Sequence, residues 1–136
     1  MRVLVVDDSP GLRRALARAL REVGQEVTTA GSGTEALRVV EHRHFDVVVS
    51  DVQMPGMGGV ELAERLSPYF PILLMTGSTD PLHTPHKVLS KPFRVEVLLE
   101  AMTEAVQAKH RSSGVVRRSG VAQRQPLKRQ RRDSNG

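Results

Sequence analysis

The chain has 136 residues, no cysteine and a formal net charge of +5. This length allows one hydrophobic core of roughly 100 to 130 residues, and the lack of cysteine excludes disulfide frameworks, thiolate metal sites and cysteine nucleophiles. The longest apolar runs, such as residues 3–6 and 72–75, are far shorter than the roughly 20 residues of a membrane span, and no signal peptide precedes them. We therefore expect a soluble, cytoplasmic protein without a membrane partner.

The positive charge is concentrated at the C-terminal end of the chain. Residues 1–107 carry 11 Lys and Arg against 14 Asp and Glu, whereas residues 108–136 carry 9 against 1. The C-terminal segment has no aromatic residue and no sustained hydrophobic period, so burial cannot offset the entropy of ordering it. We predict an acidic domain over residues 1–107 and a basic, disordered tail over residues 108–136. This tail is either a solvated extension or the one part that could bind nucleic acid, through phosphate contacts.

The first predicted elements are a strand and a helix. Residues 1–6 (MRVLVV) are apolar and β-branched, which is typical of a strand buried on both faces of a parallel sheet. This strand ends at Asp7 and Asp8. Ser9-Pro10 then indicates a helix start, and apolar residues at helical spacing continue to a stop at Gly24.

The same alternation is repeated once more before the middle of the chain. Residues 25–30 are predicted as a second strand. Ser32, followed three residues later by a glutamate, is a capping-box pattern that predicts a helix over residues 34–43. Residues 45–50 (FDVVVS) form the next buried strand, which ends at Asp51.

Two further strands and two helices complete the predicted domain. Helices are expected at residues 60–66 and 94–107, and strands at residues 72–75 and 88–90. Alternating strands and helices predict an α/β fold with a parallel sheet. We predict a flavodoxin-like (βα)5 three-layer sandwich with strand order 2-1-3-4-5, in which ligands bind at the carboxyl ends of the strands.

Five polar residues follow predicted strands at this edge of the sheet: Asp7, Asp8, Asp51, Thr76 and Lys91. Three neighbouring carboxylates repel one another unless a cation lies between them. Magnesium suits such a set because it prefers oxygen ligands and often shares its coordination shell with phosphate. The ammonium and the hydroxyl supply a charge and a hydrogen-bond donor for an incoming anion. The pattern indicates phosphoryl transfer to a carboxylate.

Four segments carry a resemblance to a known family. They are VLVVDDSP at the first strand, VVVSDVQMPGMGGVEL around Asp51, LLMTGS at the fourth strand and VLSKPF before the last helix. With these motifs in this order, the chain resembles the receiver domain of two-component response regulators over residues 1 to about 107.

The resemblance implies roles for the residues of the site. Asp51 would accept a phosphoryl group from a sensor histidine kinase or a histidine phosphotransfer protein. Thr76 would bind a phosphoryl oxygen, and Lys91 would pair with the phosphate. The Lys91-Pro92 peptide bond would be cis. Such a domain assists its own phosphorylation and dephosphorylation and is not an enzyme acting on external substrates. The implied cofactor is Mg²⁺ (or Mn²⁺), held by Asp7, Asp8, Asp51 and the backbone carbonyl of Gln53.

The sequence departs from the family pattern near the fifth strand. Receivers commonly carry Tyr or Phe three residues before the lysine, where this chain has Val88. The stretch between Thr76 and Lys91 is short, contains Pro81 and Pro85, and lacks helical periodicity. We predict that the fourth helix of the family is shortened or absent, as in receivers similar to those of hybrid sensor kinases. We therefore expect no standard phosphorylation-driven dimer through that surface.

Two other functions are compatible with parts of the pattern. A haloacid-dehalogenase-like phosphohydrolase also uses an aspartate nucleophile and magnesium, but it normally has a second aspartate two residues later, where this chain has Ser9 or Gln53. A degenerate, phosphorylation-independent interaction domain is disfavoured by the five polar residues, although Val88 leaves this alternative open. The chain could be a free-standing regulator or part of a longer hybrid kinase.

Overall fold

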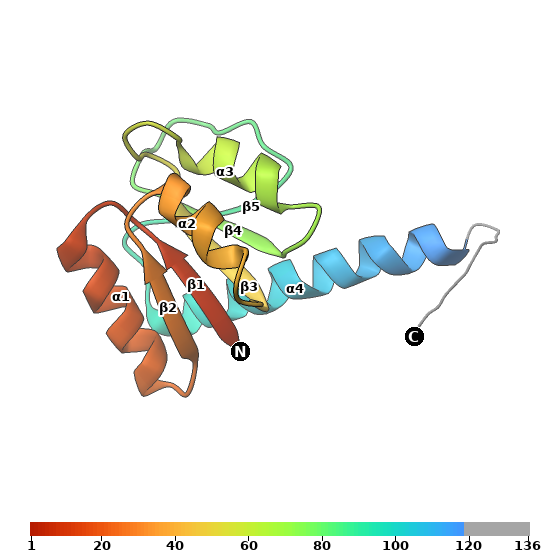
Figure 1. The fold of residues 1–136 in the computed structure, drawn as a ribbon, viewed down its shortest axis with the longest axis horizontal. Coiled ribbons are helices and arrows are strands. Elements are labelled where there is room, and N and C mark those ends of the chain that lie inside the picture. The colour runs from red at the N-terminus through yellow and green to blue at the C-terminus, as the bar shows by residue number, and fades with distance from the viewer. Residues whose placement is uncertain (119–136) are drawn as a thin grey trace. The chain divides into compact units, whose positions relative to one another are not determined.

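The computed structural model describes the backbone of residues 1–118 and the side chains of residues 1–111. Strands and helices alternate along the chain as predicted (Figure 1). The elements are β1 (Arg2–Val6), α1 (Pro10–Glu22), β2 (Glu26–Ala30), α2 (Gly33–Val40), β3 (Val47–Asp51), α3 (Gly59–Leu66), β4 (Ile72–Thr76), β5 (Lys87–Ser90) and α4 (Val95–Arg118). All five strands are parallel, in the order β2-β1-β3-β4-β5, which confirms the predicted flavodoxin-like topology.

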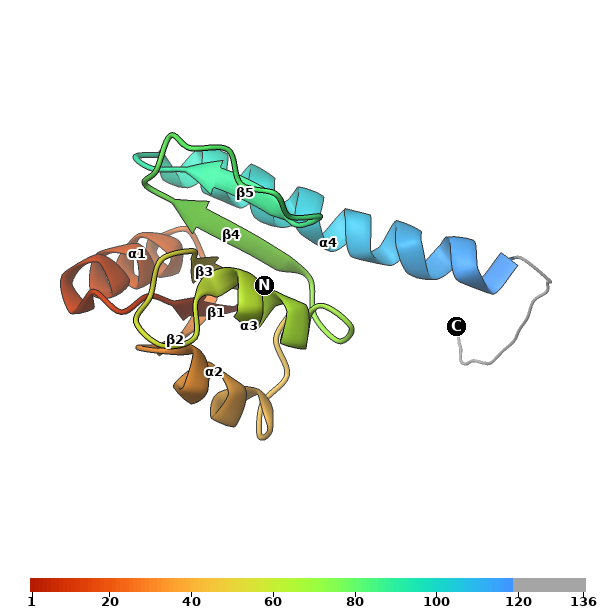
Figure 2. The same cartoon turned by 90° about the horizontal axis from the view of Figure 1, so that it is seen from above.

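Helices cover both faces of the sheet, and this explains why its central strands β1, β3 and β4 are mainly apolar. Figures 1 and 2 show α2 and α3 on one face, opposite α1 and the beginning of α4. Alternate residues of a strand point to opposite faces. The face toward α1 and α4 is lined by Val3, Val5, Val47, Val49, Leu73 and Met75. The face toward α2 and α3 is lined by Leu4, Val6, Val48, Ile72 and Leu74.

Two helix ends differ from the predicted ones. Helix α2 ends at Val40 rather than at residue 43, because the next two backbone N–H groups bond three residues back and close the helix in a tighter turn. Helix α4 continues to Arg118, whereas the sequence pattern predicts an end at residue 107 and a disordered tail from residue 108. Extending a helix that is already nucleated costs little per residue, which accounts for this continuation.

The chain divides into two units, Met1–Val106 and Gln107–Gly136. The first unit contains the whole sheet and both core clusters. In the second unit, α4 continues to Arg118, and the remainder of the predicted basic tail, residues 119–136, lies outside the described residues.

The connection between β4 and β5, residues 77–86, contains no helix, which confirms the predicted loss of the family's fourth helix. Side-chain oxygens instead accept bonds from nearby backbone N–H groups: Thr76 Oγ1 from Ser78 at 3.1 Å, Ser78 Oγ from Asp80 at 3.0 Å, and Thr84 Oγ1 from His86 at 3.3 Å. Such local bonds compete with helical hydrogen bonding. The segment is therefore a series of short turns.

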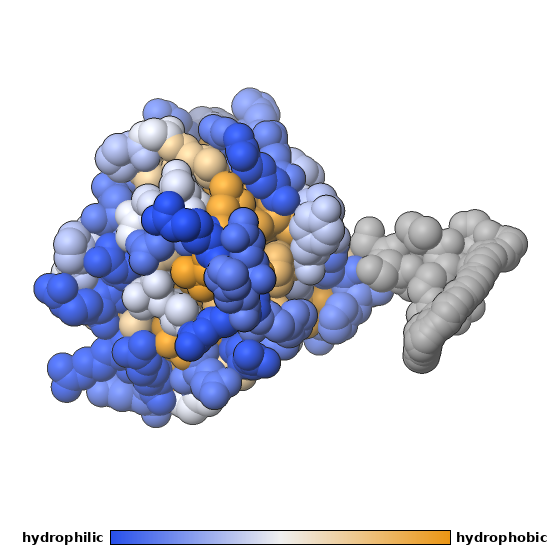
Figure 3. Space-filling view, viewed as in Figure 1, coloured by the Kyte–Doolittle hydropathy of each residue, from blue (hydrophilic) through white to orange (hydrophobic). Residues whose placement is uncertain are grey.

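The surface seen in Figure 3 is mainly hydrophilic, with small hydrophobic areas between the helices. The large apolar side chains that are most exposed, Tyr69 and Leu12, belong to a loop and to α1. None of the described helices is both long and apolar enough to cross a membrane.

Candidate functional site

The topology brings three carboxylates together at the carboxyl edge of the sheet. Strands β1 and β3 are adjacent and in register, with Val6 opposite Ser50, so the residues that follow them are neighbours. Carboxylate oxygens of Asp7, Asp8 and Asp51 all lie within 4.8 Å of one another. The predicted acidic cluster therefore exists, and below we call these three residues the acidic cluster.

Asp7 is the most fixed member of this cluster. The residue is 1% exposed. Its backbone N–H donates to the carbonyl of Ala30 at 3.1 Å, and its Oδ1 accepts from the backbone N–H of Ser9 at 2.9 Å. The next residue, Asp8, is exposed. Asp7 thus points inward, whereas Asp8 faces the solvent side of the cluster.

Asp51 is the last residue of β3, and its side chain is 13% exposed. Burial raises the pKa of its carboxyl group above the ordinary value, and the negative charge of Asp7 acts in the same direction. The ammonium of Lys91 and a hydrogen bond from the backbone of Gln53 lower the pKa but do not cancel these effects. Burial and the neighbouring Asp7 thus outweigh the attraction of Lys91 at this carboxyl group.

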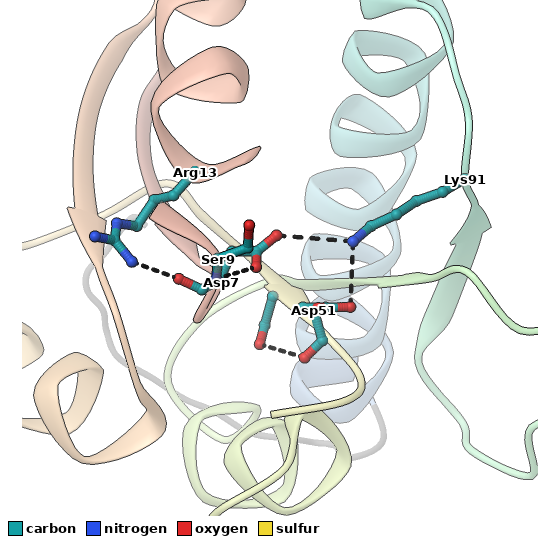
Figure 4. A network of polar contacts seen from close by, with 6 residues as sticks. Asp7, Ser9, Arg13, Asp51 and Lys91 are labelled. Atoms are coloured by element: carbon teal, nitrogen blue, oxygen red, sulfur yellow. Dashed lines mark hydrogen bonds and ion pairs between the residues drawn. The ribbon is translucent and has the colours of Figure 1, made fainter. Parts of the chain in front are cut away.

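Lys91 extends across the cluster from the loop after β5 (Figure 4). Its Nζ lies 3.4 Å from Asp51 Oδ1 and 3.7 Å from Asp7 Oδ2. Its backbone N–H donates to the carbonyl of Thr76 at 2.7 Å, which ties the end of β4 to this loop. The Lys91-Pro92 peptide bond is cis, as the resemblance implied.

Thr76 and Gln53 lie at the border of the site. Thr76 is buried at the end of β4, and its hydroxyl oxygen accepts the bond from Ser78. Among the described contacts this hydroxyl makes no hydrogen bond to Asp51. Gln53 is exposed, two residues beyond Asp51. The structure thus brings Asp7, Asp8, Asp51 and Lys91 into contact distance and leaves Thr76 adjacent to them.

One residue that positions the site was not predicted from the sequence. A Cβ atom added to Gly59, at the start of α3, would lie 2.1 Å from the carbonyl oxygen of Asp51. The N–H of Gly59 also donates to the carbonyl of Val52 at 2.9 Å. Only a glycine allows the helix to approach the end of β3 this closely. The glycine pair Gly58-Gly59, where α3 begins, was the feature of the sequence that could have indicated this close approach.

The donor set fits a hard divalent cation. All the candidate ligands are oxygens, and carboxylates, carbonyls and water are the ligands that Mg²⁺ and Mn²⁺ prefer. The three carboxylates of the acidic cluster face a single described ammonium, that of Lys91, so a bound cation would complete the charge balance. A parallel α/β sheet with a cation-binding acidic edge and a lysine beside it defines a class of phosphate-handling domain.

Comparison with known proteins identifies the family within that class. The chain belongs to the response regulator receiver domain family, whose model matches residues 3–103. It is 36% identical over 113 residues to the sensor histidine kinase RcsC of Escherichia coli K12, covering 76% of this chain and 12% of RcsC. It is 32% identical over 135 residues to the transcriptional regulatory protein GlrR of the same strain, covering 92% of this chain and 30% of GlrR. The chain therefore corresponds to a minor part of these relatives.

Solved structures agree with this assignment. The chemotaxis protein CheY4 of Vibrio cholerae superimposes with a TM-score of 0.69 at 35% identity, covering 76% of this chain and 97% of CheY4. The response regulator TrrA of Thermotoga maritima, in complex with Mg²⁺ and BeF, gives a TM-score of 0.68 at 32% identity, with the same coverage. Receiver domains are phosphoacceptors of two-component signalling, and this chain is one of them.

Proposed function

We propose that Asp51 is the residue that accepts the phosphoryl group. The observation that carries this assignment is the different situation of the three carboxylates. Asp7 is buried and bonded to the backbone of Ser9, and Asp8 is exposed and forms no ion pair with the side chains that the structure describes. Asp51 alone both reaches the surface and lies next to Lys91 Nζ.

The cation that this site would hold is Mg²⁺, or Mn²⁺, with Asp7, Asp8, Asp51 and the backbone carbonyl of Gln53 as its ligands. When bound, it would supply positive charge that offsets the carboxylates and the incoming phosphate. Lys91, whose Nζ lies 3.4 Å from Asp51 Oδ1, supplies a second positive charge, and the Thr76 hydroxyl donates a hydrogen bond to a phosphoryl oxygen. These groups together neutralise the charge of the transferring group.

The reaction follows from these positions. A carboxylate oxygen of Asp51 forms the new bond to phosphorus while the phosphorus–nitrogen bond of a phosphohistidine breaks. The electron pair of that bond stays on nitrogen, and the ring, already protonated on its other nitrogen, leaves as neutral imidazole. The product is an acyl phosphate. Positioning and charge neutralisation supply most of the catalysis in such transfers. The chain itself supplies Lys91, Thr76 and the ligands of the cation. It therefore assists its own phosphorylation and dephosphorylation without turning over external substrates.

The donor is a sensor histidine kinase or a histidine phosphotransfer protein, and we place this exchange in the cytoplasm. The receiver corresponds to residues 1–107, and residues 108–136 are a basic C-terminal tail whose first part, to Arg118, continues α4. Any contact with nucleic acid is confined to this tail because residues 1–107 carry a net negative charge.

Labelling with a small phosphodonor tests the assignment of Asp51. Acetyl phosphate with Mg²⁺ should add about one phosphate per molecule of the unmodified chain, and Asp51→Asn should add none. Asp80→Asn is the matched control, because Asp80 is an exposed carboxylate in the 77–86 segment and outside the acidic cluster. Labelling of Asp51→Asn at the normal stoichiometry, or continuous release of phosphate over many turnovers, would refute the proposal.

A further inference from the structure

A single arginine holds the backbone between the two N-terminal aspartates. Arg13 lies in the first part of α1, and its Nη1 donates to the carbonyl oxygen of Asp7 at 2.8 Å (Figure 4). Its backbone N–H donates to the carbonyl of Ser9 at 2.9 Å, as expected for the first turn of a helix. Arg13 therefore closes the loop between β1 and α1 through both its side chain and its backbone.

The guanidinium group is itself held in place by the loop after β2. A Cβ atom added to Gly31 would lie 3.0 Å from Arg13 Nη1 and 3.5 Å from Glu35 Oε1, so the guanidinium group rests against the Gly31 backbone. Glu35 Oε1 accepts the N–H of Gly31 at 2.7 Å, which fixes this turn. The absence of a side chain at Gly31 is what leaves room for Arg13.

These contacts fix the peptide group that joins Asp7 to Asp8. The N–H of Asp7 is bonded to Ala30, its side chain to Ser9 and its carbonyl to Arg13. Because a peptide unit is planar, holding the carbonyl of Asp7 also orients the N–H and the Cα of Asp8. The Asp8 side chain has no hydrogen bond or ion pair among the described contacts, so its place in the acidic cluster depends on this backbone.

We infer that Arg13 is a positioning residue for the cation site: it holds the Asp7–Asp8 peptide so that both carboxylates face one Mg²⁺. The inference rests on the proposed function. Residues that hold metal ligands in place commonly change metal affinity by about 10- to 100-fold when they are replaced. The charge of Arg13 acts in the opposite direction, because a cation near the site repels Mg²⁺. Weaker Mg²⁺ binding after replacement of Arg13 would therefore indicate lost positioning of the ligands, and tighter binding would indicate lost charge repulsion.

The experiment uses the full chain and Mg²⁺ alone. Thermal unfolding is followed over a series of MgCl2 concentrations at constant ionic strength, and the rise in melting temperature gives the Mg²⁺ dissociation constant. Arg13→Met keeps the apolar stem and removes the donor. Arg14→Met is the matched control, since Arg14 is exposed, has the same charge and has no described partner. Gly31→Val displaces the guanidinium group and leaves every charge in place.

The expected result is a dissociation constant about tenfold higher in Arg13→Met. Gly31→Val should raise it by a smaller factor, and Arg14→Met should leave it unchanged or slightly lower. A purely structural role would lower the melting temperature equally at every Mg²⁺ concentration. If Arg13→Met does not fold, Gly31→Val decides the question.

Mg²⁺ binding by Arg13→Met as tight as by Arg14→Met would overturn the inference, and so would unchanged binding by Gly31→Val. The unmodified chain serves as the separate test of the proposed function, because a failure of that chain to bind Mg²⁺ contradicts the magnesium-dependent site itself.

Discussion

The two halves of the site are built in different ways. The half at β1 and β3 contains the acidic cluster, and its backbone is held by close contacts to neighbouring elements, such as Asp7 with Ala30 and Asp51 with Gly59. The half at β4 and β5 supplies Thr76 and Lys91, and these are joined by residues 77–86, which form turns instead of a helix. The chain therefore has the charged groups of the site, whereas the segment that links Thr76 to Lys91 lacks a helix.

This difference separates the chemistry of the site from its coupling to the surface. The proposed charge neutralisation at Asp51 needs the acidic cluster, which would hold the cation, and the ammonium of Lys91. All of these residues are in place. The family's usual coupling through an aromatic side chain has no counterpart here, since Val88 occupies that position as a half-buried residue packed on the core. We expect large effects from changes to the backbone around the acidic cluster and to Lys91, and small ones from changes to residues 77–86.

The largest expected effect comes from the close contact in the β1–β3 half. Gly59→Ala should destabilise the fold by about 3 kcal/mol, because its Cβ atom would lie 2.1 Å from the backbone oxygen of Asp51 and the start of α3 must move. Urea unfolding measures this change. Gly11→Ala is the control, since a Cβ atom there has no neighbour within 4 Å. Equal stability of the two variants would show that α3 is not held against β3.

Lys91→Met tests the single side chain that links the two halves. Loss of its ammonium should slow labelling by acetyl phosphate about 100-fold, which is typical for removing one charge-stabilising group. Lys87→Met is the matched control, because Lys87 begins β5, the strand that precedes Lys91, and pairs with Glu104 away from the acidic cluster. Near-normal labelling of Lys91→Met at saturating Mg²⁺ would mean that the cation alone suffices.

The raised pKa of Asp51 predicts a smaller, pH-dependent effect on stability. A carboxyl group whose pKa is higher in the folded chain than its ordinary value of 3.8 stabilises the fold below that value, and this contribution is lost as pH rises through the folded pKa. With EDTA present, Asp51→Asn should therefore be more stable than the unmodified chain at pH 7. The difference should shrink as the pH falls to 4, as measured by urea unfolding. A less stable variant at pH 7 would show that attraction to Lys91 outweighs burial.

Most of the fold and the members of the site were predictable because they follow from local patterns. Apolar runs that end in Asp7, Asp51 or Thr76 indicate both a buried strand and the edge at which it ends. The contacts of Gly59 and Arg13 were not predictable in this way. They depend on how closely α3 approaches β3 and on which carbonyl a long side chain reaches, and these are properties of the packed structure.

The ends of helices also show the limit of prediction from local sequence patterns. Ser32 and its glutamate identify the beginning of α2, where Ser32 Oγ accepts the backbone N–H of Glu35 at 3.0 Å. The sequence has no comparable stop signal at the end of α2, and α4 continues past the predicted boundary at residue 107. Starts with a capping side chain are therefore better defined by sequence than ends without one.

The smallest expected effect concerns association after activation. Treatment with beryllofluoride and Mg²⁺, a mimic of the phosphorylated state, should leave the molecular mass in light scattering unchanged. The reason lies in the β4–β5 half: residues 77–86 provide turns with hydroxyl-capped N–H groups where a dimer would need a helix face, and a stable interface needs roughly 800 Å² from each partner. Asp51→Asn, which lacks the proposed acceptor, sets the baseline. A mass that doubles only in the unmodified chain would mean that the turns themselves, or another surface, transmit the state of Asp51, and the separation between the two halves would not hold.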